Sequence, residues 1–118
     1  MQNDTVVRIT EDTSPQIIID LFQFPYEYFS NKYGNSNDCL LDIACGNGLQ
    51  TDMLKSKFRE VISADVEPQK DFVIEGSVDN IPLSDNSVDW IFSFETLEHV
   101  DEESQIKAIS EFRSVAIS

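Results

Sequence analysis

A glycine-bearing turn near the middle of the 118-residue chain sets the framework for the rest of the fold. The apolar run Cys39–Ile43 leads into Ala44-Cys45-Gly46-Asn47-Gly48, and apolar side chains then recur at helical spacing over residues 49–58. This order predicts a buried strand, a tight turn and a helix. Glycine lets a ligand approach the backbone closely, and the start of a helix offers unpaired N–H groups to an anion. We therefore expect a carboxylate or phosphate there, with a plain strand-to-helix connection as the alternative.

Further elements are predicted on both sides of this turn. Ser14 and Pro15 form a helix start, and the apolar residues up to position 29 predict two short helices or one helix kinked at Pro25. Strands are predicted at 61–64, at 72–74 and at 89–94, and a helix opens on three acids from residue 101. Because helices and strands alternate, the sequence predicts an α/β fold with a parallel sheet.

Two stretches depart from this regular pattern. Residues 66–71 are too few for a crossover helix, so we expect a loop or a single turn between the second and third strands. Residues 1–14 are polar and acidic, and they are expected to form an arm or a short edge element that precedes the domain at 15–118.

An acidic residue, Asp65, ends the second predicted strand, 17 residues after Gly48. In doubly wound sheets an acid at this place accepts hydrogen bonds from ribose hydroxyls, although alone it is also typical of a helix cap or turn. Together with the glycine turn it favours a nucleoside-containing ligand. A dinucleotide fits poorly, because Thr51 stands where the G-x-G-x-x-G fingerprint counted from Gly46 needs its third glycine. A dinucleotide-dependent oxidoreductase is therefore a distant alternative.

The net charge of −14, from 22 acidic against 8 basic side chains, argues against binding a phosphate backbone through bulk charge. Nucleic acid is therefore not an expected partner, and an anionic membrane surface would repel the chain. No apolar run approaches the length of about 18 residues typical of a membrane-spanning helix. Cys39, Cys45 and the lone His99 are too few for a disulfide scaffold or a four-ligand zinc site. We expect a cytoplasmic protein without a metal.

Four segments, in order, resemble the motifs of class I S-adenosylmethionine-dependent methyltransferases of the type 11 group. Residues 40–48 are similar to the first motif, an acid followed by a small residue and two spaced glycines, and residues 61–68 are similar to the second. Residues 72–89 resemble the third region, and residues 94–100 resemble the segment that closes the fourth strand. The resemblance implies a Rossmann-like parallel sheet with flanking helices and S-adenosyl-L-methionine as the cofactor.

The resemblance also implies a role for each matching residue. The turn would cradle the methionine end of the cofactor, and the acid before it would favour the ammonium group. Asp65 would take the two ribose hydroxyls. Ser77 and the backbone N–H of Val78 would flank the adenine. Phe94 and Glu95, at the end of the fourth strand, would lie beside the reactive methyl. The implied cofactor-binding residues are Asp42, Ala44, Cys45, Gly46, Gly48, Asp65, Val66, Ser77, Val78, Phe94 and Glu95.

Three positions qualify this assignment. Ala44 replaces the commoner first glycine of the motif, and its methyl is small enough for binding to be tolerated. Ser77 stands where an Asp usually accepts from the adenine amino group, so weaker binding is expected without charge assistance. His99 is a weak candidate for a catalytic base, because many methyl transfers need little more than positioning of the nucleophile.

The length bears on the expected activity. A full class I domain has several more strands, so by resemblance the chain is an incomplete cofactor-binding part, truncated after the fourth strand and its helix. Strand 89–94 would then be an exposed edge, and we expect self-association through it. The expected function is S-adenosylmethionine-dependent methyl transfer to a small-molecule acceptor, whose identity the sequence does not give. The alternative is a catalytically inactive binding or interaction module that needs a partner chain.

Overall fold

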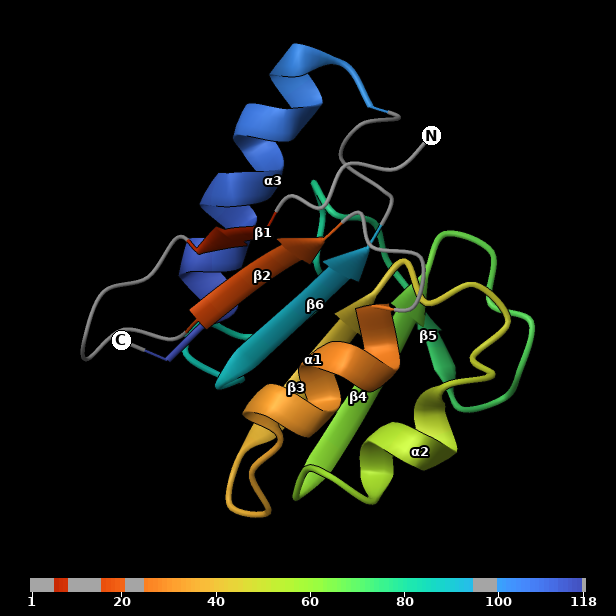
Figure 1. The fold of residues 1–118 in the computed structure, drawn as a ribbon. Helices are drawn as coiled ribbons and strands as arrows, with labels where there is room; N and C mark the ends of the chain where they lie inside the picture. The colour runs from red at the N-terminus through yellow and green to blue at the C-terminus, as the bar shows by residue number, and fades with distance from the viewer. Residues whose placement is uncertain (1–5, 9–15, 21–24, 95–99, 118) are drawn as a thin grey trace.

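The computed structural model describes residues 6–8, 16–20, 25–94 and 100–117. These residues form one six-stranded sheet in the order β1-β2-β6-β3-β4-β5, with helices on both faces (Figure 1). In chain order the elements are β1 (Val6–Arg8), β2 (Gln16–Asp20), α1 (Pro25–Tyr33), β3 (Cys39–Ile43), α2 (Thr51–Lys55), β4 (Glu60–Asp65), β5 (Val73–Glu75), β6 (Trp90–Phe94) and α3 (Glu102–Val115).

The sheet is parallel except at one edge. Strands β2, β6, β3, β4 and β5 all run in one direction, and β1 pairs with β2 in the opposite direction. The predicted Rossmann-like α/β fold is therefore confirmed. The chain passes from β3 to β4 and β5 on one side and then crosses to β6 on the other, so the strand order reverses between β3 and β6. In open α/β sheets, ligands bind outside the carboxyl ends of the strands at such a reversal.

Each face of the sheet has its own hydrophobic core. Every residue of β3 is buried, as expected for an inner strand of a parallel sheet covered on both sides. Side chains alternate between the faces, so that Leu41 joins the core beneath α3 and Leu40 joins the core beneath α1 and α2. In β6, Ile91 and Phe92 divide in the same way.

The prediction for the N-terminal segment was wrong, because residues 16–20 form strand β2 and not a helix. Ile17, Ile18 and Ile19 are consecutive β-branched residues, which favour an extended chain, and the spacing of such a short apolar run fits a strand as well as a buried helix. Pro25 does not kink a helix, since it is the first residue of α1, where its missing N–H is tolerated. The predicted helix start at residues 14 and 15 lies outside the described residues.

Strand β6 lies inside the sheet, so the prediction of an exposed edge at residues 89–94 was also wrong. It pairs with β3 on one side and with β2 on the other, from Gln16 opposite Trp90 to Asp20 opposite Phe94. The outer strands of the described sheet are β5 and β1, the latter being the short edge element expected within the N-terminal arm. Self-association through residues 89–94 therefore loses its structural basis.

The remaining elements agree with the sequence. The stretch between β4 and β5 contains no helix, as its length predicted, while α2 is shorter than the predicted span of 49–58. Helix α3 begins after Asp101, whose carboxylate accepts the Ser104 N–H at 2.7 Å. This bond holds the pKa of Asp101 below its usual value. Across the described parts of the chain, no helix is both long and apolar enough to cross a membrane.

Candidate functional site

The glycine turn after β3 has an unusual backbone. Ala44, Gly46 and Gly48 have φ angles of 65°, 64° and 75°, in the left-handed region that favours glycine. The turn is anchored to the neighbouring strand, because the N–H groups of Ala44 and Cys45 both donate to the Ala64 carbonyl, at 2.8 and 3.0 Å. A Cβ atom placed on Gly46 would meet nothing within 4 Å. The turn therefore presents open backbone at this point, as a ligand cradle requires.

Asp65 connects this turn to the end of β4. Its Oδ2 atom accepts the Gly46 N–H at 2.8 Å, and its Oδ1 atom accepts the Glu67 N–H at 3.0 Å. Its carbonyl oxygen accepts the Gly76 N–H at 3.0 Å, which brings the end of β5 to the same place. The two backbone donors fix the carboxylate but leave further lone pairs on both oxygens. Asp65 is thus oriented in advance, with acceptor capacity for a diol.

Asp42, the acid before the turn, is almost fully buried, with 1% of its surface exposed. Its Oδ1 atom accepts a hydrogen bond of 2.8 Å from the hydroxyl of Tyr26 in α1. Burial raises the pKa of Asp42 to about 7, the Tyr26 hydrogen bond acts to lower it, and the nearby Asp65 raises it. A cationic group placed beside Asp42 would favour its ionised form.

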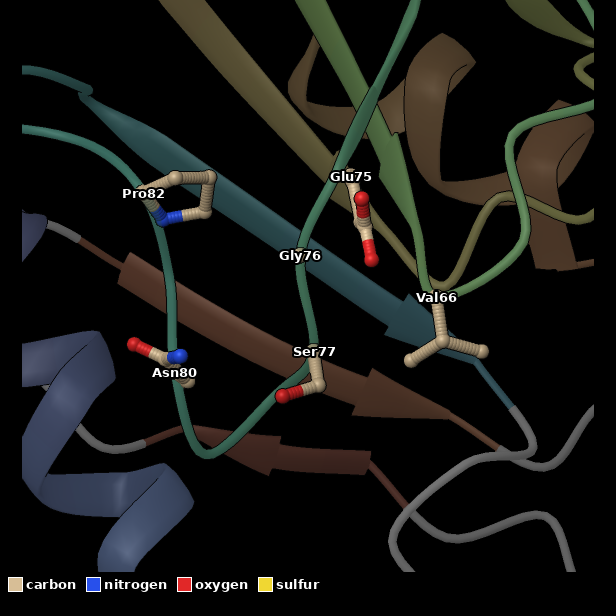
Figure 2. Close-up of a pocket in the computed structure, with 6 residues that line it drawn as sticks. All are labelled: Val66, Glu75, Gly76, Ser77, Asn80 and Pro82. Carbon is tan, nitrogen blue, oxygen red and sulfur yellow. The ribbon is translucent and has the colours of Figure 1, made fainter.

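A pocket of about 280 Å³ opens beside Val66, the residue that follows Asp65 in the chain (Figure 2). Val66 and Ser77, two of the predicted site residues, meet in its lining. The pocket takes its walls from the residue after β4 and from the stretch that ends β5 and continues into the following loop. The lining residues are Val66, Glu75, Gly76, Ser77, Asn80 and Pro82.

The loop that carries Ser77 is held in a defined shape. Ser77 and Asn80 exchange backbone hydrogen bonds at 3.2 and 3.0 Å, and the Ser77 hydroxyl donates to Asp79 Oδ1 at 2.6 Å. Gly76 is required by close packing, because a Cβ there would lie 2.5 Å from the Pro82 ring. Since its proton is committed to Asp79, the Ser77 hydroxyl offers lone pairs to a ligand donor.

Four of the lining residues were not predicted from the sequence: Glu75, Gly76, Asn80 and Pro82. One signal for Glu75 was available, since the carboxyl ends of adjacent parallel strands meet at one edge of a sheet and Glu75 ends β5 beside Asp65. Asn80 and Pro82 follow only from the fold of the loop, which no periodicity in the sequence specifies.

The remaining predicted site residues are Val78, Phe94, Glu95 and the weak candidate His99. The Val78 side chain is buried in the core beneath α3, so the predicted adenine contact would have to come from its backbone. Phe94 lies at the carboxyl end of β6 and packs into the core beneath α1, with its ring edge-on to that of Tyr26 at 4.9 Å. Glu95 and His99 lie outside the described residues. The structure thus brings together the turn, Asp42, Asp65, Val66 and Ser77.

Cys45 is half-buried within the turn. Burial, with the nearby Asp42 and Asp65, raises the pKa of its thiol to about 11, so the thiol is neutral at physiological pH and is a poor nucleophile. Cys39 is also a free cysteine and is buried. Among the described residues, no three His, Cys, Asp or Glu side chains are grouped in a way that could hold a metal ion.

Comparisons with known proteins agree with this geometry. A solved structure from Methanococcus maripaludis, assigned as an S-adenosyl-L-methionine-dependent methyltransferase, matches this fold with a TM-score of 0.63 and 21% sequence identity. The match covers 79% of this chain and 49% of that chain, so this chain spans about half of the other protein's length. At this identity the similarity shows the fold alone. No curated protein matches the chain.

A family model described as a methyltransferase domain matches residues 41–118. The matched range begins within β3 and includes the glycine turn, Asp65, the whole pocket lining and α3. Because the match covers more than half of the chain and contains the motifs that form the site, this chain belongs to the methyltransferase-domain family.

Proposed function

We propose that this chain binds S-adenosyl-L-methionine at the carboxyl edge of its sheet and takes part in methyl transfer to a small-molecule acceptor. The observation that carries the proposal is the position of Asp65, which is hydrogen-bonded to the glycine turn on one side and to the end of β5 beside the pocket on the other. One carboxylate thus adjoins both of the places that a nucleoside with a charged tail would occupy.

The residues present suit this cofactor. Asp65 has acceptor capacity for the two ribose hydroxyls, and Asp42 supplies a negative charge for the ammonium group. The open backbone at Gly46 leaves room for the methionine end. The pocket has the volume and the mixed polar and apolar lining suited to a flat base, with Val66 against its face and the Ser77 hydroxyl as an acceptor. The backbone N–H of Val78, the residue after Ser77, is the proposed donor to the base.

When bound, the cofactor supplies an electrophilic methyl group on a sulfonium ion. The contribution of the chain is to hold that group and to orient it toward an acceptor. Phe94, which ends β6, and Glu95, the next residue in the sequence, are proposed to lie beside the methyl group. His99 is a weak candidate for the base that takes a proton from the acceptor. We propose a cytoplasmic location, since a reducing compartment suits the free cysteines Cys39 and Cys45.

Calorimetry with S-adenosylhomocysteine tests the proposed site directly. Asp65→Ala is expected to lower the affinity at least tenfold, because it removes both ribose acceptors and the anchor of the turn. Asp85→Ala is a matched control, since it removes the same charge from an exposed turn away from the pocket lining. Equal affinities of the wild type and Asp65→Ala would refute the assigned site.

A second function is favoured by one observation, namely that this chain spans about half of the solved structure that it matches. A chain that binds the cofactor but needs a partner chain to complete the acceptor site would be a binding or interaction module without activity of its own. Transfer of a labelled methyl group by the isolated 118-residue chain would rule this alternative out.

A further inference from the structure

Tyr26 connects the first helix to the acid of the glycine-turn motif. Its hydroxyl donates to Asp42 Oδ1 at 2.8 Å across a separation of 16 residues. The tyrosine ring is held in place by Phe94, edge-on at a centroid distance of 4.9 Å, and by the hydrophobic core beneath α1. Because Asp42 is only 1% exposed, this hydroxyl replaces part of the solvation that the carboxyl group loses on burial.

The charge balance around Asp42 depends on this bond. Desolvation and the neighbouring Asp65 raise the pKa of Asp42, whereas the Tyr26 hydroxyl lowers it. A third titratable group, the Cys45 thiol, lies near Asp42 and Asp65. This thiol is neutral because its own pKa is raised to about 11. No basic side chain among the described residues contributes to the pKa of Asp42. Tyr26 is therefore the protein group that favours the ionised form.

We propose that Tyr26 is a positioning residue for the amino-acid end of the cofactor, holding the Asp42 carboxylate oriented and ionised to receive the ammonium group. The bond occupies one acceptor position on Oδ1 and leaves the others for the ligand. This inference rests on the proposed function, because it requires a ligand whose ammonium group lies beside Asp42. It adds that α1, which precedes the family motifs in sequence, takes part in the site.

The test compares the wild type with Tyr26→Phe by calorimetry between pH 6 and 8.5, using two probes. S-adenosylhomocysteine carries the ammonium group, whereas 5′-methylthioadenosine lacks the amino-acid end. In the wild type, the affinity for S-adenosylhomocysteine is expected to fall below pH 7, by up to about tenfold per pH unit. In Tyr26→Phe this fall begins at higher pH, so the variant binds several-fold to tenfold more weakly at pH 7 and recovers toward pH 8.5.

The second probe separates positioning from general damage to the fold. The affinity for 5′-methylthioadenosine is expected to be equal in the two proteins and to show no matching pH dependence. Tyr33→Phe is the matched control, because Tyr33 lies on the same helix but packs its ring against Trp90, at the amino end of β6. This control is expected to retain the wild-type pH profile.

Three outcomes would contradict the proposal. An unchanged pH profile in Tyr26→Phe overturns the role of Tyr26 while leaving the proposed function intact. Equal losses for both probes at every pH would mean a purely structural role and also overturn it. Binding of neither probe by the wild type would overturn the proposed function and, with it, this inference.

An Asp42→Asn background covers the case in which Tyr26→Phe alone does not fold, because the amide buries no charge. In the Asp42→Asn background, S-adenosylhomocysteine is expected to bind weakly and without pH dependence. Adding Tyr26→Phe to this background is expected to cause no further loss of affinity. A further loss in the double variant would show that the hydroxyl acts by some route other than Asp42, and would overturn the proposal.

Discussion

The hydroxyls of Thr51 and Ser63 share a hydrogen bond of 2.9 Å, and both residues are buried. Thr51 is the first residue of α2, three residues after Gly48, and Ser63 lies in β4 two residues before Asp65. The bond therefore fixes the helix at one end of the turn to the strand that carries Asp65. The Ala64 carbonyl holds the other end through the N–H groups of Ala44 and Cys45. Strand β4 thus supports the turn from both sides.

Breaking the Thr51–Ser63 bond is expected to destabilise the fold. Thr51→Val keeps the side-chain volume but leaves the Ser63 hydroxyl buried without its partner, which costs about 1–3 kcal/mol. Ser63→Ala is expected to have a similar effect, and the double variant is expected to lose less than the sum, because no unpaired hydroxyl remains. Urea denaturation of the four proteins measures the coupling. Strictly additive losses would mean that the bond contributes nothing to stability.

Gly46 and Gly48 are expected to respond differently to alanine. Both have positive φ, so each alanine costs about 1–2 kcal/mol of backbone strain. A Cβ on Gly46 enters open space, whereas one on Gly48 lies 3.0 Å from the Phe72 ring. Gly46→Ala should therefore mainly weaken S-adenosylhomocysteine binding, and Gly48→Ala should mainly lower the free energy of unfolding. Denaturation and calorimetry on the same samples check this, and the same ratio of the two losses in both variants would contradict it.

Ala44 is expected to be a position where glycine stabilises the chain. Its φ of 65° is unfavourable for a residue with a Cβ, so Ala44→Gly should raise the free energy of unfolding by about 0.5–1 kcal/mol, after the added flexibility of the unfolded chain is subtracted. Ala108→Gly, within α3, is the control and should instead lose about 1 kcal/mol of helix propensity, with a further loss from its buried methyl group. Thermal unfolding measures both, and a loss of stability in Ala44→Gly would argue against strain at this turn.

The parts of the fold that were predicted correctly depend on local patterns. The run Cys39–Ile43, the spaced glycines and the apolar run at 61–64 are local patterns, so the strand, the turn and the next strand followed from them. Strand β2 was missed because Ile17, Ile18 and Ile19 fit two structures locally, and pairing with the distant β6 decides between them. The same pairing removed the predicted exposed edge.

The candidate site likewise contains residues that a pattern in the sequence marks and residues that only long-range contacts bring into place. The turn and Asp65 were found because local patterns mark them, and Asp42 was found through the family resemblance. Tyr26 was not singled out, since nothing in its neighbours indicates a contact with an acid 16 residues away. Asn80 and Pro82 line the pocket because of how one loop folds. Long-range contacts of this kind are properties of the packed chain, and spacing in the sequence does not encode them.

Asp42 is expected to lower the stability of the fold at neutral and higher pH, because its carboxylate is buried at the site. Its pKa rises from 3.8, its usual value, to about 7 on folding, so the folded chain binds a proton there that the unfolded chain has already lost. The contribution of Asp42 to the free energy of unfolding therefore falls as the pH rises from about 4 to about 7. Above pH 7 the full destabilisation is on the order of 4 kcal/mol. Asp42→Asn should remove this cost, giving a variant more stable than the wild type at pH 8 and nearly equal to it at pH 4.

Urea denaturation of the two proteins from pH 4 to pH 8 measures that difference, and calorimetry with S-adenosylhomocysteine measures the accompanying loss of binding. Taking the difference between the two proteins cancels the titration of the other carboxylates, which are common to both. A difference in stability that does not change with pH would show that Asp42 is ionised throughout in the folded chain. In that case the surrounding groups, with Tyr26 first among them, stabilise the carboxylate more strongly than its burial destabilises it.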